Sequence, residues 1–322
     1  MTVPFLLAPM AELSHRPLRE LIEGFSGPGS GCDEYFTEMI SAGPLLGGGP
    51  FESWYMDAGP CPERVVYQLV GSDPEQIVRA AILLDSRECL GIDINMGCAA
   101  PAIRRTGAGV AWMASIDKAG SLIARVRQVV KKRLSVKLRI GFEDDFDYLL
   151  NFCRRLEGEG VELVTLHPRT AGEKFKRSPR WDYVTALRRE LHIPVAGNGD
   201  IASAADLLHR ADMGGPVMVG RAAVRHPWIF AQARSAQAQG MALGARIDLE
   251  ETALRFLELL TRYQPPEFHI SRALRFFNYF CDNLKWAHYV KTLLNREKTP
   301  GGIERALRGY FGEHPEERYT KY

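Results

Sequence analysis

The chain has 322 residues, of which 46% are hydrophobic and 25% are charged, a balance typical of a soluble globular protein. Its formal net charge of +2 excludes nucleic-acid binding through overall charge, so such a role needs a local basic patch. The six cysteines lack the spacing of zinc ligands or of a disulfide framework, and no run approaches the roughly 18 apolar residues of a membrane span. We therefore expect a monomeric cytoplasmic protein with reduced cysteines, no structural metal and no membrane association.

Short apolar runs alternate with longer amphipathic segments over the first 220 residues. The runs predict strands over 5–10, 34–39, 65–70, 91–96, 134–140, 162–167, 193–198 and 216–220. Helical patterns lie between most of them, over 16–25, 74–85, 118–132, 145–157, 181–190 and 203–210. About eight strand–helix units form a (β/α)8 TIM barrel, an α/β fold. A doubly wound sheet is the competing fold, but it needs a GxGxxG loop after the first strand, where this chain has LAPMAELSHRPLREL.

The pattern changes near residue 240. The segment AQARSAQAQGMALGARIDLE predicts a helix followed by a linker, and no strand pattern follows from about Leu249 onward. Three amphipathic segments, EETALRFLELLTRY, HISRALRFFNYFCDNLKW and AHYVKTLLNR, predict helices. We therefore expect a catalytic barrel domain over 1–240 and a small all-helical domain over 249–322, with a loose polar end.

Polar or small residues stand at the carboxyl end of every predicted strand, where the active site of a TIM barrel lies. In chain order they are Ala8, Pro9 and Met10; Thr37 and Glu38; Gln68; Asn95 and Cys98; Lys137 and Arg139; His167 and Arg169; Asn198, Gly199 and Asp200; and Gly220 and Arg221. Taken singly, each is better explained by a structural role. Together they occupy one rim of the predicted barrel, which indicates a ligand site.

The last two strands end in VAGNGD and VMVGRAA, each with a glycine. Glycine lets the backbone approach an anion, and Arg221 can bind phosphate oxygens, although tight turns also favour glycine. One phosphate site beside a lysine suggests a mononucleotide across the barrel mouth, and FMN fits. The amide of Gln68 would bond a ring edge, and Lys137 would stabilise negative charge on the reduced ring.

The segment IDINMGCAAP places a lone cysteine, Cys98, just after the fourth strand. Most single cysteines are small buried apolar residues. In a rim loop of small residues, this thiol is also well placed to reach a bound molecule.

Eight ordered motifs resemble the flavin-dependent tRNA-dihydrouridine synthases, from about Leu6 to Ile229: LAPMAELSHRPLREL, TEMISAGPLL, QLVGSDP, DINMGC, SVKLRIGF, LHPRT, VAGNGDI and VMVGRAA. The resemblance implies an FMN-binding barrel that reduces the 5,6 double bond of uridines in tRNA, with NADPH as electron source. It implies that Cys98 is the proton donor, and that the cofactor-binding residues are Ala8, Pro9, Met10, Gln68, Lys137, His167, Asn198, Gly199, Asp200, Gly220 and Arg221.

The chemistry of this reaction explains the thiol. Hydride transfer to uracil carbon 6 builds negative charge toward carbon 5, and an acid must then supply a proton there. A cysteine thiol is mostly protonated at neutral pH, so it can act as that acid. The target base must leave its stack to reach the site.

Two motifs depart from the family pattern. The family continues GCP with a lysine three residues after the cysteine, where this chain has Ala99 and Pro101. Arg104 or Arg105 is a candidate for the missing cation. His15 stands where an aspartate is common. The cysteine itself is intact, so we expect activity, while the substrate choice stays open.

Three other functions remain open: an FMN enzyme acting on free pyrimidines, a synthase acting on ribosomal RNA, and an inactive RNA-binding homologue. Retention of Cys98 and Lys137 argues against the inactive homologue. Cations and aromatics on the C-terminal helices favour RNA, although a solvated helical bundle also carries such charges. They are His269, Arg272, Arg275, Lys285, His288, Lys291, Arg296 and Lys298, with Phe276, Phe277, Tyr279, Trp286 and Tyr289.

Overall fold

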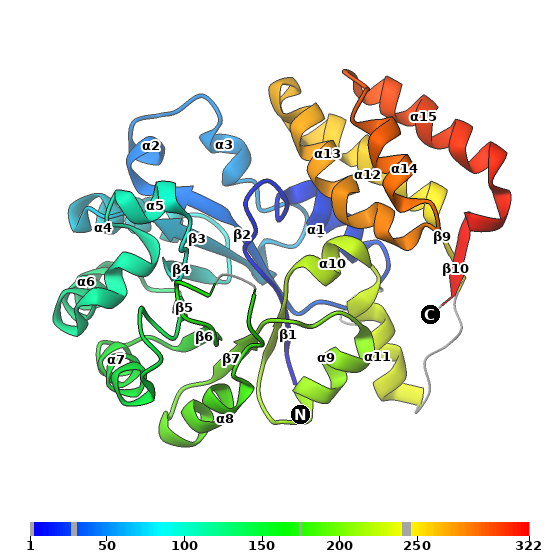
Figure 1. Ribbon diagram of the computed structural model, residues 1–322. Helices are drawn as coiled ribbons and strands as arrows, with labels where there is room; N and C mark the ends of the chain where they lie inside the picture. The colour runs from blue at the N-terminus through cyan, green and yellow to red at the C-terminus, as the bar shows by residue number, and fades with distance from the viewer. Residues whose placement is uncertain (1–2, 27–30, 174–175, 240–245, 322) are drawn as a thin grey trace.

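A computed structural model describes residues 3–26, 31–173, 176–239 and 246–321. Eight parallel strands follow one another in chain order around a closed barrel (Figure 1): β1 (Phe5–Leu7), β2 (Glu34–Ser41), β3 (Val65–Val70), β4 (Gly91–Met96), β5 (Arg133–Arg139), β6 (Leu163–His167), β7 (Val195–Asn198) and β8 (Val217–Val219). Because β1 pairs with both β2 and β8, the sheet has no edge strand. The predicted TIM barrel is therefore confirmed, and the doubly wound sheet is excluded.

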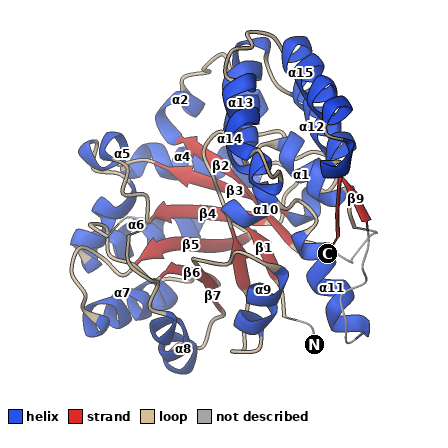
Figure 2. Cartoon of the chain, turned by 45° about the vertical axis from the view of Figure 1, so that its right-hand side comes forward, coloured by secondary structure: helices blue, strands red, loops and turns tan. Residues whose placement is uncertain are grey.

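Helices surround the barrel (Figure 2). They are α1 (Arg16–Glu23), α2 (Ala42–Leu46), α3 (Glu52–Tyr55), α4 (Pro74–Asp85), α5 (Pro101–Arg105), α6 (Ile116–Val129), α7 (Phe146–Gly158), α8 (Trp181–Glu190), α9 (Ala204–Ala211), α10 (Arg221–Arg225) and α11 (Ile229–Gln239). The sequence did not predict α2, α3, α5 and α10, because helices of five residues or fewer are too short to show a 3.6-residue period.

Side-chain caps set where the longer helices begin. Asp73 accepts a hydrogen bond from an N–H in the first turn of α4, and Ser115 and Asp145 do the same for α6 and α7. Ser203 begins α9 with a reciprocal capping box. Since each of these helices follows a strand, the caps fix where the loops at the carboxyl ends of the strands stop.

Strand β1 is shorter than predicted. It ends at Leu7, so Ala8, Pro9 and Met10 belong to the loop that follows. Pro9 has no N–H to donate to a sheet, and the N–H of Met10 bonds instead to Ser14 Oγ, at 2.8 Å. The predicted strand end therefore becomes a wall of the barrel mouth.

The interior of the barrel has an apolar lower layer and a polar upper layer. Leu6, Ala8, Phe36, Val66, Leu163, Ala196 and Met218 form an apolar cluster of their own, separate from the core between strands and helices. Toward the carboxyl ends of the strands the interior positions are polar, and they recur at every second residue because side chains alternate across a strand. They include Gln68, Asn95, Lys137, Thr165, His167 and Asn198.

Four further helices follow the barrel: α12 (Leu249–Tyr263), α13 (His269–Phe280), α14 (Ala287–Leu294) and α15 (Pro300–Glu313). They lie beside the barrel in Figures 1 and 2, where α12 contacts α1 and α13 contacts α10. One buried core includes Leu18 of α1 and Phe256 of α12. The predicted C-terminal helices are confirmed, while the domain boundary stays a prediction. The linker predicted between the two domains includes residues 240–245, which lie outside the described residues.

The prediction of a loose C-terminal end without strands was wrong. β10 (Tyr319–Lys321) pairs antiparallel with β9 (Arg246–Asp248). Arg318 joins the same region, with ion pairs to Asp248 at 2.7 Å and Glu250 at 3.1 Å. Strands of three residues are too short to show alternation, and the two lie about seventy residues apart in sequence, so neither signal was visible.

Part of the predicted RNA-binding set on α13 was also misplaced. Arg272, Phe276 and Phe277 are buried, on the helix face that packs against the rest of the protein. Residues four apart share a helix face, so Arg272 with Phe276 and Ala273 with Phe277 lie together on one broad inner side of α13. They are not available to bind RNA.

His15, the departure from the family aspartate, is buried at the start of α1. An aspartate there would cap the helix, whereas His15 makes no side-chain cap. Its ring nitrogens have no hydrogen-bond partner among the described residues. Burial, together with the charges of Arg272 and Arg19, lowers the pKa of His15 well below its ordinary value. The imidazole is therefore neutral.

Within the described ranges, no helix is both long enough and apolar enough to cross a membrane.

Candidate active site

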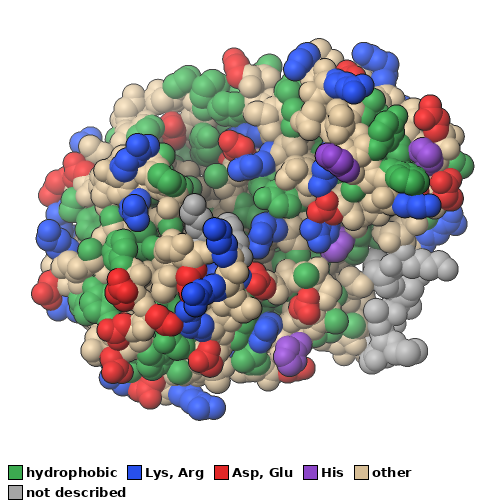
Figure 3. Space-filling view, in the orientation of Figure 1, with side chains coloured by type: hydrophobic (Ala, Val, Ile, Leu, Met, Phe, Trp, Pro, Cys, Tyr) green, Lys and Arg blue, Asp and Glu red, His purple; other side chains and the backbone are tan. Residues whose placement is uncertain are grey.

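A cavity of about 540 Å³ opens at the carboxyl ends of the strands. Pockets of this size bind small organic ligands and cofactors. Its wall contains Cys98 and every predicted cofactor-binding residue except Gln68: Ala8, Pro9, Met10, Lys137, His167, Asn198, Gly199, Asp200, Gly220 and Arg221. Figure 3 shows the surface hollowed near the middle of this face, with Lys and Arg side chains gathered beside the hollow.

A wider groove of about 1280 Å³ runs between α1, α12 and α15. Its lining carries charges of both signs, and several are paired with one another, as Arg318 is with Asp248. None of the predicted site residues lies in it. The smaller cavity is therefore the candidate active site.

A chain of buried hydrogen bonds lies under the cavity floor. Ser135 Oγ donates to Asp93 Oδ1 at 2.6 Å, and Gln68 Nε2 donates to Asp93 Oδ2 at 2.7 Å. Asn95 Nδ2 donates to Gln68 Oε1 at 2.9 Å. Burial raises the pKa of Asp93 to about 6, against the opposing effect of its two donors. The network fixes which way the amides of Gln68 and Asn95 point.

Gln68 therefore lies beneath the cavity rather than in its wall. Its side chain is fully buried, and both ends of its amide are bonded within the network. Its predicted contact with a cofactor ring stays a prediction.

The Cys98 loop is held on three sides. Asn95 Oδ1 accepts hydrogen bonds from the N–H groups of Gly97, at 3.2 Å, and Cys98, at 2.9 Å. Arg139 Nε donates to the carbonyl of Gly97 at 3.1 Å. Gly109 has a φ of +61°, and a Cβ there would lie 2.5 Å from the carbonyl oxygen of Cys98, so only glycine fits. The half-buried thiol is thus presented to the cavity from a fixed loop.

Lys137 places a positive charge in the same wall. Its ammonium has no hydrogen bond or ion pair to another described residue, although it is half-buried. Burial, and then the charge of Arg139, lowers the pKa of Lys137 to about 8, so the group is still protonated at pH 7. A half-buried ammonium without an acceptor indicates a site for an electron-rich ligand.

His167 is a neutral imidazole in this wall. Burial, and then the charges of Lys137, Arg139, Arg169 and Arg221, lowers the pKa of His167 to about 2. Arg169 Nη1 lies 3.1 Å from His167 Nε2. Because a guanidinium can only donate, Nε2 accepts, and the single ring proton is on Nδ1.

Charged residues surround the glycine turns after β7 and β8. Arg169 makes a two-point ion pair with Asp200, at 3.0 and 2.5 Å, and Arg221 lies 3.8 Å from the same carboxylate. Arg169 is buried, whereas Arg221 is exposed at the cavity edge. Arg221 is therefore the guanidinium that an anionic ligand can reach.

Glycine keeps this side of the cavity open. Gly199 has a φ of +134°, and a Cβ there would lie 3.2 Å from the ring of His167. A Cβ at Gly220 would enter the space beside Ala8 and Met10, at 3.6 Å from each. Both positions let the backbone border the cavity directly.

The predicted site set omitted several wall residues: Ala11, Met39, Asn95, Gly97, Ala99, Ala100, Pro101, Arg139, Arg169 and Ile201. Asn95 and Arg139 were visible as strand-end residues, and each lies two positions beyond another interior residue. Strand alternation was thus the signal that could have added them. Arg104 and Arg105, the candidates for the missing cation, are exposed on α5 and do not line the cavity. The cation that contacts the cysteine loop is Arg139, which bonds to the carbonyl of Gly97.

A family model and several relatives that match this chain all carry the same description, dihydrouridine synthase. The family model described as "Dihydrouridine synthase (Dus)" matches residues 6–301. The chain is 31% identical over 271 residues to a "Probable tRNA-dihydrouridine synthase" of Aquifex aeolicus, covering 81% of each chain. It is 28% identical over 313 residues to a "tRNA-dihydrouridine synthase B" of Xanthomonas axonopodis pv. citri, covering 95% of this chain and 92% of that one. A "Probable tRNA-dihydrouridine synthase" of Rhodobacter capsulatus is 32% identical over 239 residues, covering 72% and 71%.

The buried network predicts an unequal cost for two substitutions in the same interior layer. Gln68→Leu leaves Asp93 Oδ2 without its donor and Asn95 Nδ2 without its acceptor, and it should lower the free energy of unfolding by about 1–3 kcal/mol. The hydroxyl of Thr165 is buried without a hydrogen-bond partner among the described residues. Thr165→Val should therefore leave stability unchanged or raise it by about 1 kcal/mol. Urea denaturation measures both, and equal losses would contradict the network.

Proposed function

The chain belongs to the dihydrouridine synthase family, a family of flavin oxidoreductases, and we propose that it reduces the 5,6 double bond of uridines in tRNA. We propose FMN as its cofactor, NADPH as its electron source and Cys98 as its proton donor. The observation that carries this proposal is the convergence of the Cys98 thiol and the Lys137 ammonium on one cavity at the barrel mouth.

The residues around the cavity fit FMN. Lys137 offers an ammonium with no other hydrogen-bond acceptor among the described residues, and Arg221 offers an accessible guanidinium for a phosphate. The backbone at Gly199 and Gly220 leaves room for a ligand to approach. When bound and reduced by NADPH, FMN supplies the hydride that uracil carbon 6 receives.

The chain's own groups would then handle charge and protons. Cys98 would donate its proton to carbon 5 as the carbon 6 bond forms, and the thiolate would regain a proton from solvent through the open cavity. Lys137 would stay protonated and stabilise negative charge beside it. Neutral His167 would remain a hydrogen-bonding group, since its lowered pKa prevents it from acting as a cation. Asn95 and Arg139 would keep the cysteine loop in place during this step.

An exposed surface on the C-terminal helices supports RNA as the substrate. Trp286 and Tyr289 are 49% and 55% exposed at the start of α14. They lie among exposed cationic and histidine side chains on the same helix and its flanks, namely Lys285, His288, Arg296 and Lys298. Aromatic rings beside cations bind exposed bases and phosphates. We call these six residues the α14 surface.

The α14 surface favours RNA over a free pyrimidine, which would not need it. Cations and aromatic rings bind ribosomal RNA equally well, so this surface does not distinguish a tRNA substrate from a ribosomal RNA substrate. Three cations of the predicted RNA-binding set are not part of this surface. Arg272 is buried, Arg275 forms an ion pair with Glu12 at 3.4 Å, and Lys291 forms one with Asp282 at 2.5 Å.

Substitution of Cys98 tests its proposed role as the acid. Cys98→Ala should leave FMN binding and NADPH oxidation nearly unchanged, while it slows uridine reduction by about 10²–10⁴-fold, the usual contribution of a general acid. Single-turnover reduction of unmodified tRNA by the reduced protein measures this step. Cys61→Ala is the matched control, because Cys61 is also half-buried but lies outside the cavity wall. If Cys98→Ala reduces uridine at the same single-turnover rate as the control, Cys98 is not the acid and has only a structural role.

Charge reversal tests the α14 surface. Changing Lys285, Arg296 and Lys298 together to Glu should weaken tRNA binding and flatten its salt dependence. The slope of log affinity against log salt should fall by about 0.7–0.9 for each phosphate that the variant no longer neutralises. Reversal of three exposed cations on the outer side of the barrel, Arg79, Lys118 and Lys131, is the matched control. If both triple variants keep the wild-type slope and the same FMN content, the α14 surface does not bind RNA.

A further inference from the structure

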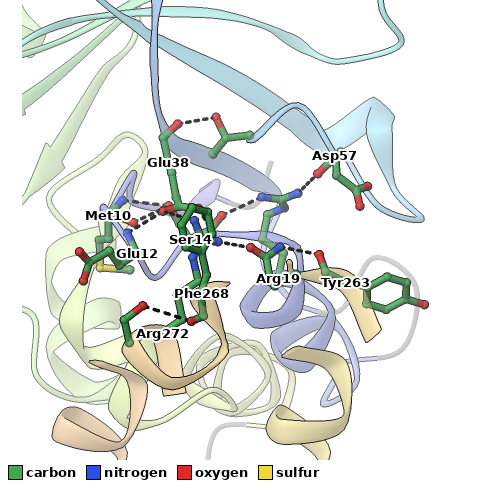
Figure 4. Close-up of polar contacts among 12 residues, drawn as sticks. Met10, Glu12, Ser14, Arg19, Glu38, Asp57, Tyr263, Phe268 and Arg272 are labelled. Carbon is green, nitrogen blue, oxygen red and sulfur yellow. Dashed lines mark hydrogen bonds and ion pairs between the residues drawn. The ribbon is translucent and has the colours of Figure 1, made fainter. Parts of the chain in front are cut away.

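Glu38 and Arg272 form a buried ion pair between the barrel and the C-terminal helices. Glu38 lies near the carboxyl end of β2, and Arg272 lies on α13. Arg272 Nη1 is 3.1 Å from Glu38 Oε2, and each side chain is only 4% exposed. Breaking a buried pair leaves an uncompensated charge, so each partner strongly requires the other. Figure 4 shows this contact beside the loop that follows β1.

Arg272 is also held by residues at the ends of the C-terminal helices. Arg272 Nη1 also donates to Gln264 Oε1, at the end of α12. Its guanidinium lies 4.7 Å from the ring centroid of Phe268, in the turn between α12 and α13. The position of Arg272 therefore depends on how these helices are packed.

Glu38 also contacts the loop after β1. Its Oε1 accepts a hydrogen bond from the N–H of Glu12 at 2.6 Å. Glu12 has a φ of +64°, a left-handed conformation that costs energy for any residue with a Cβ. Such a conformation persists only where its surroundings hold it. The buried Glu38 carboxylate holds the backbone of Glu12, while the exposed side chain of Glu12 forms an ion pair with Arg275 at 3.4 Å.

The Glu12 turn shapes one wall of the cavity. Ala8, Pro9, Met10 and Ala11, directly before it, all line the cavity. The N–H of Met10 donates to Ser14 Oγ at 2.8 Å, which closes the loop across Glu12. A change in the Glu12 conformation would therefore move the cavity wall.

We propose that Arg272 is a positioning residue: through Glu38 it holds Glu12 in its left-handed conformation, so the packing of the C-terminal helices sets the shape of the cofactor wall. The side chain that resembles an RNA-binding cation in the sequence thus links the two parts of the protein. The link to FMN rests on the proposed function, whereas the link to the loop does not.

Arg272→Met tests the proposal in the full-length protein with two readouts. Amide hydrogen exchange at Met10 and Glu12 should become at least about tenfold faster, because the loop opens once Glu38 loses its partner. If the loop is then competent about a tenth of the time, the Kd for FMN should rise about tenfold. Arg305→Met, an exposed arginine on α15, is the matched control and should change neither.

Glycine at position 12 gives a rescue that a general loss of stability would not show. Glycine adopts positive φ without cost, so Glu12→Gly added to Arg272→Met should restore slow exchange at Met10 and bring the Kd for FMN back to within about twofold of wild type. If Arg272→Met does not fold, Arg272→Lys, which keeps the buried charge, is compared with and without Glu12→Gly in the same way.

The two readouts separate the two claims. The proposal is overturned if amide exchange at Met10 and Glu12 stays at the wild-type rate in a folded Arg272 variant. It is also overturned if exchange becomes faster and Glu12→Gly does not return the rate at Met10 to that of wild type. Accelerated exchange with rescue supports the coupling even if wild-type protein binds no FMN, an outcome that would overturn the proposed cofactor instead.

Discussion

The buried carboxyl group of Asp93 is the constraint on which the site depends. A carboxyl group inside a closed barrel is costly to bury unless it is hydrogen-bonded, because water cannot reach it. Ser135 and Gln68 meet that need, and in doing so Gln68 turns its carbonyl toward Asn95. The carbonyl oxygen of Asn95 is then left to hold the backbone at Cys98. The buried Asp93 carboxyl group thus helps to fix where the Cys98 thiol lies.

A second constraint acts from outside the barrel. The loop after β1 contains a left-handed Glu12, and its hydrogen bond to Glu38 ties it to a buried arginine on α13. The network inside the barrel holds the Cys98 loop, and the ion pair leads through Glu38 to the loop after β1. Both loops line the same cavity. Helices that carry an exposed aromatic and cationic surface therefore have a physical connection to the proposed cofactor site.

Much of the site could be predicted because it follows from one rule. Lys137, His167 and Asn198 stand at the carboxyl ends of parallel strands, and a TIM barrel brings all such ends to one rim. The depth of Gln68 could not be predicted, because it depends on the register between β3 and β4. The burial of Arg272 could have been found from the period of α13, but its partner Glu38 is 234 residues away. Pairing between β9 and β10 is hidden for the same reason of distance.

The most direct test of the proposed function is a competition among substrates. FMN-loaded protein and NADPH are mixed with unmodified tRNA, a ribosomal RNA fragment and free uracil, and the reduced base in each pool is quantified by mass spectrometry. We expect dihydrouridine in tRNA, at defined positions, and no reduction of free uracil. Reduction of uracil in preference to both RNAs, or no reduced base in any pool from protein that holds FMN and oxidises NADPH, would contradict it.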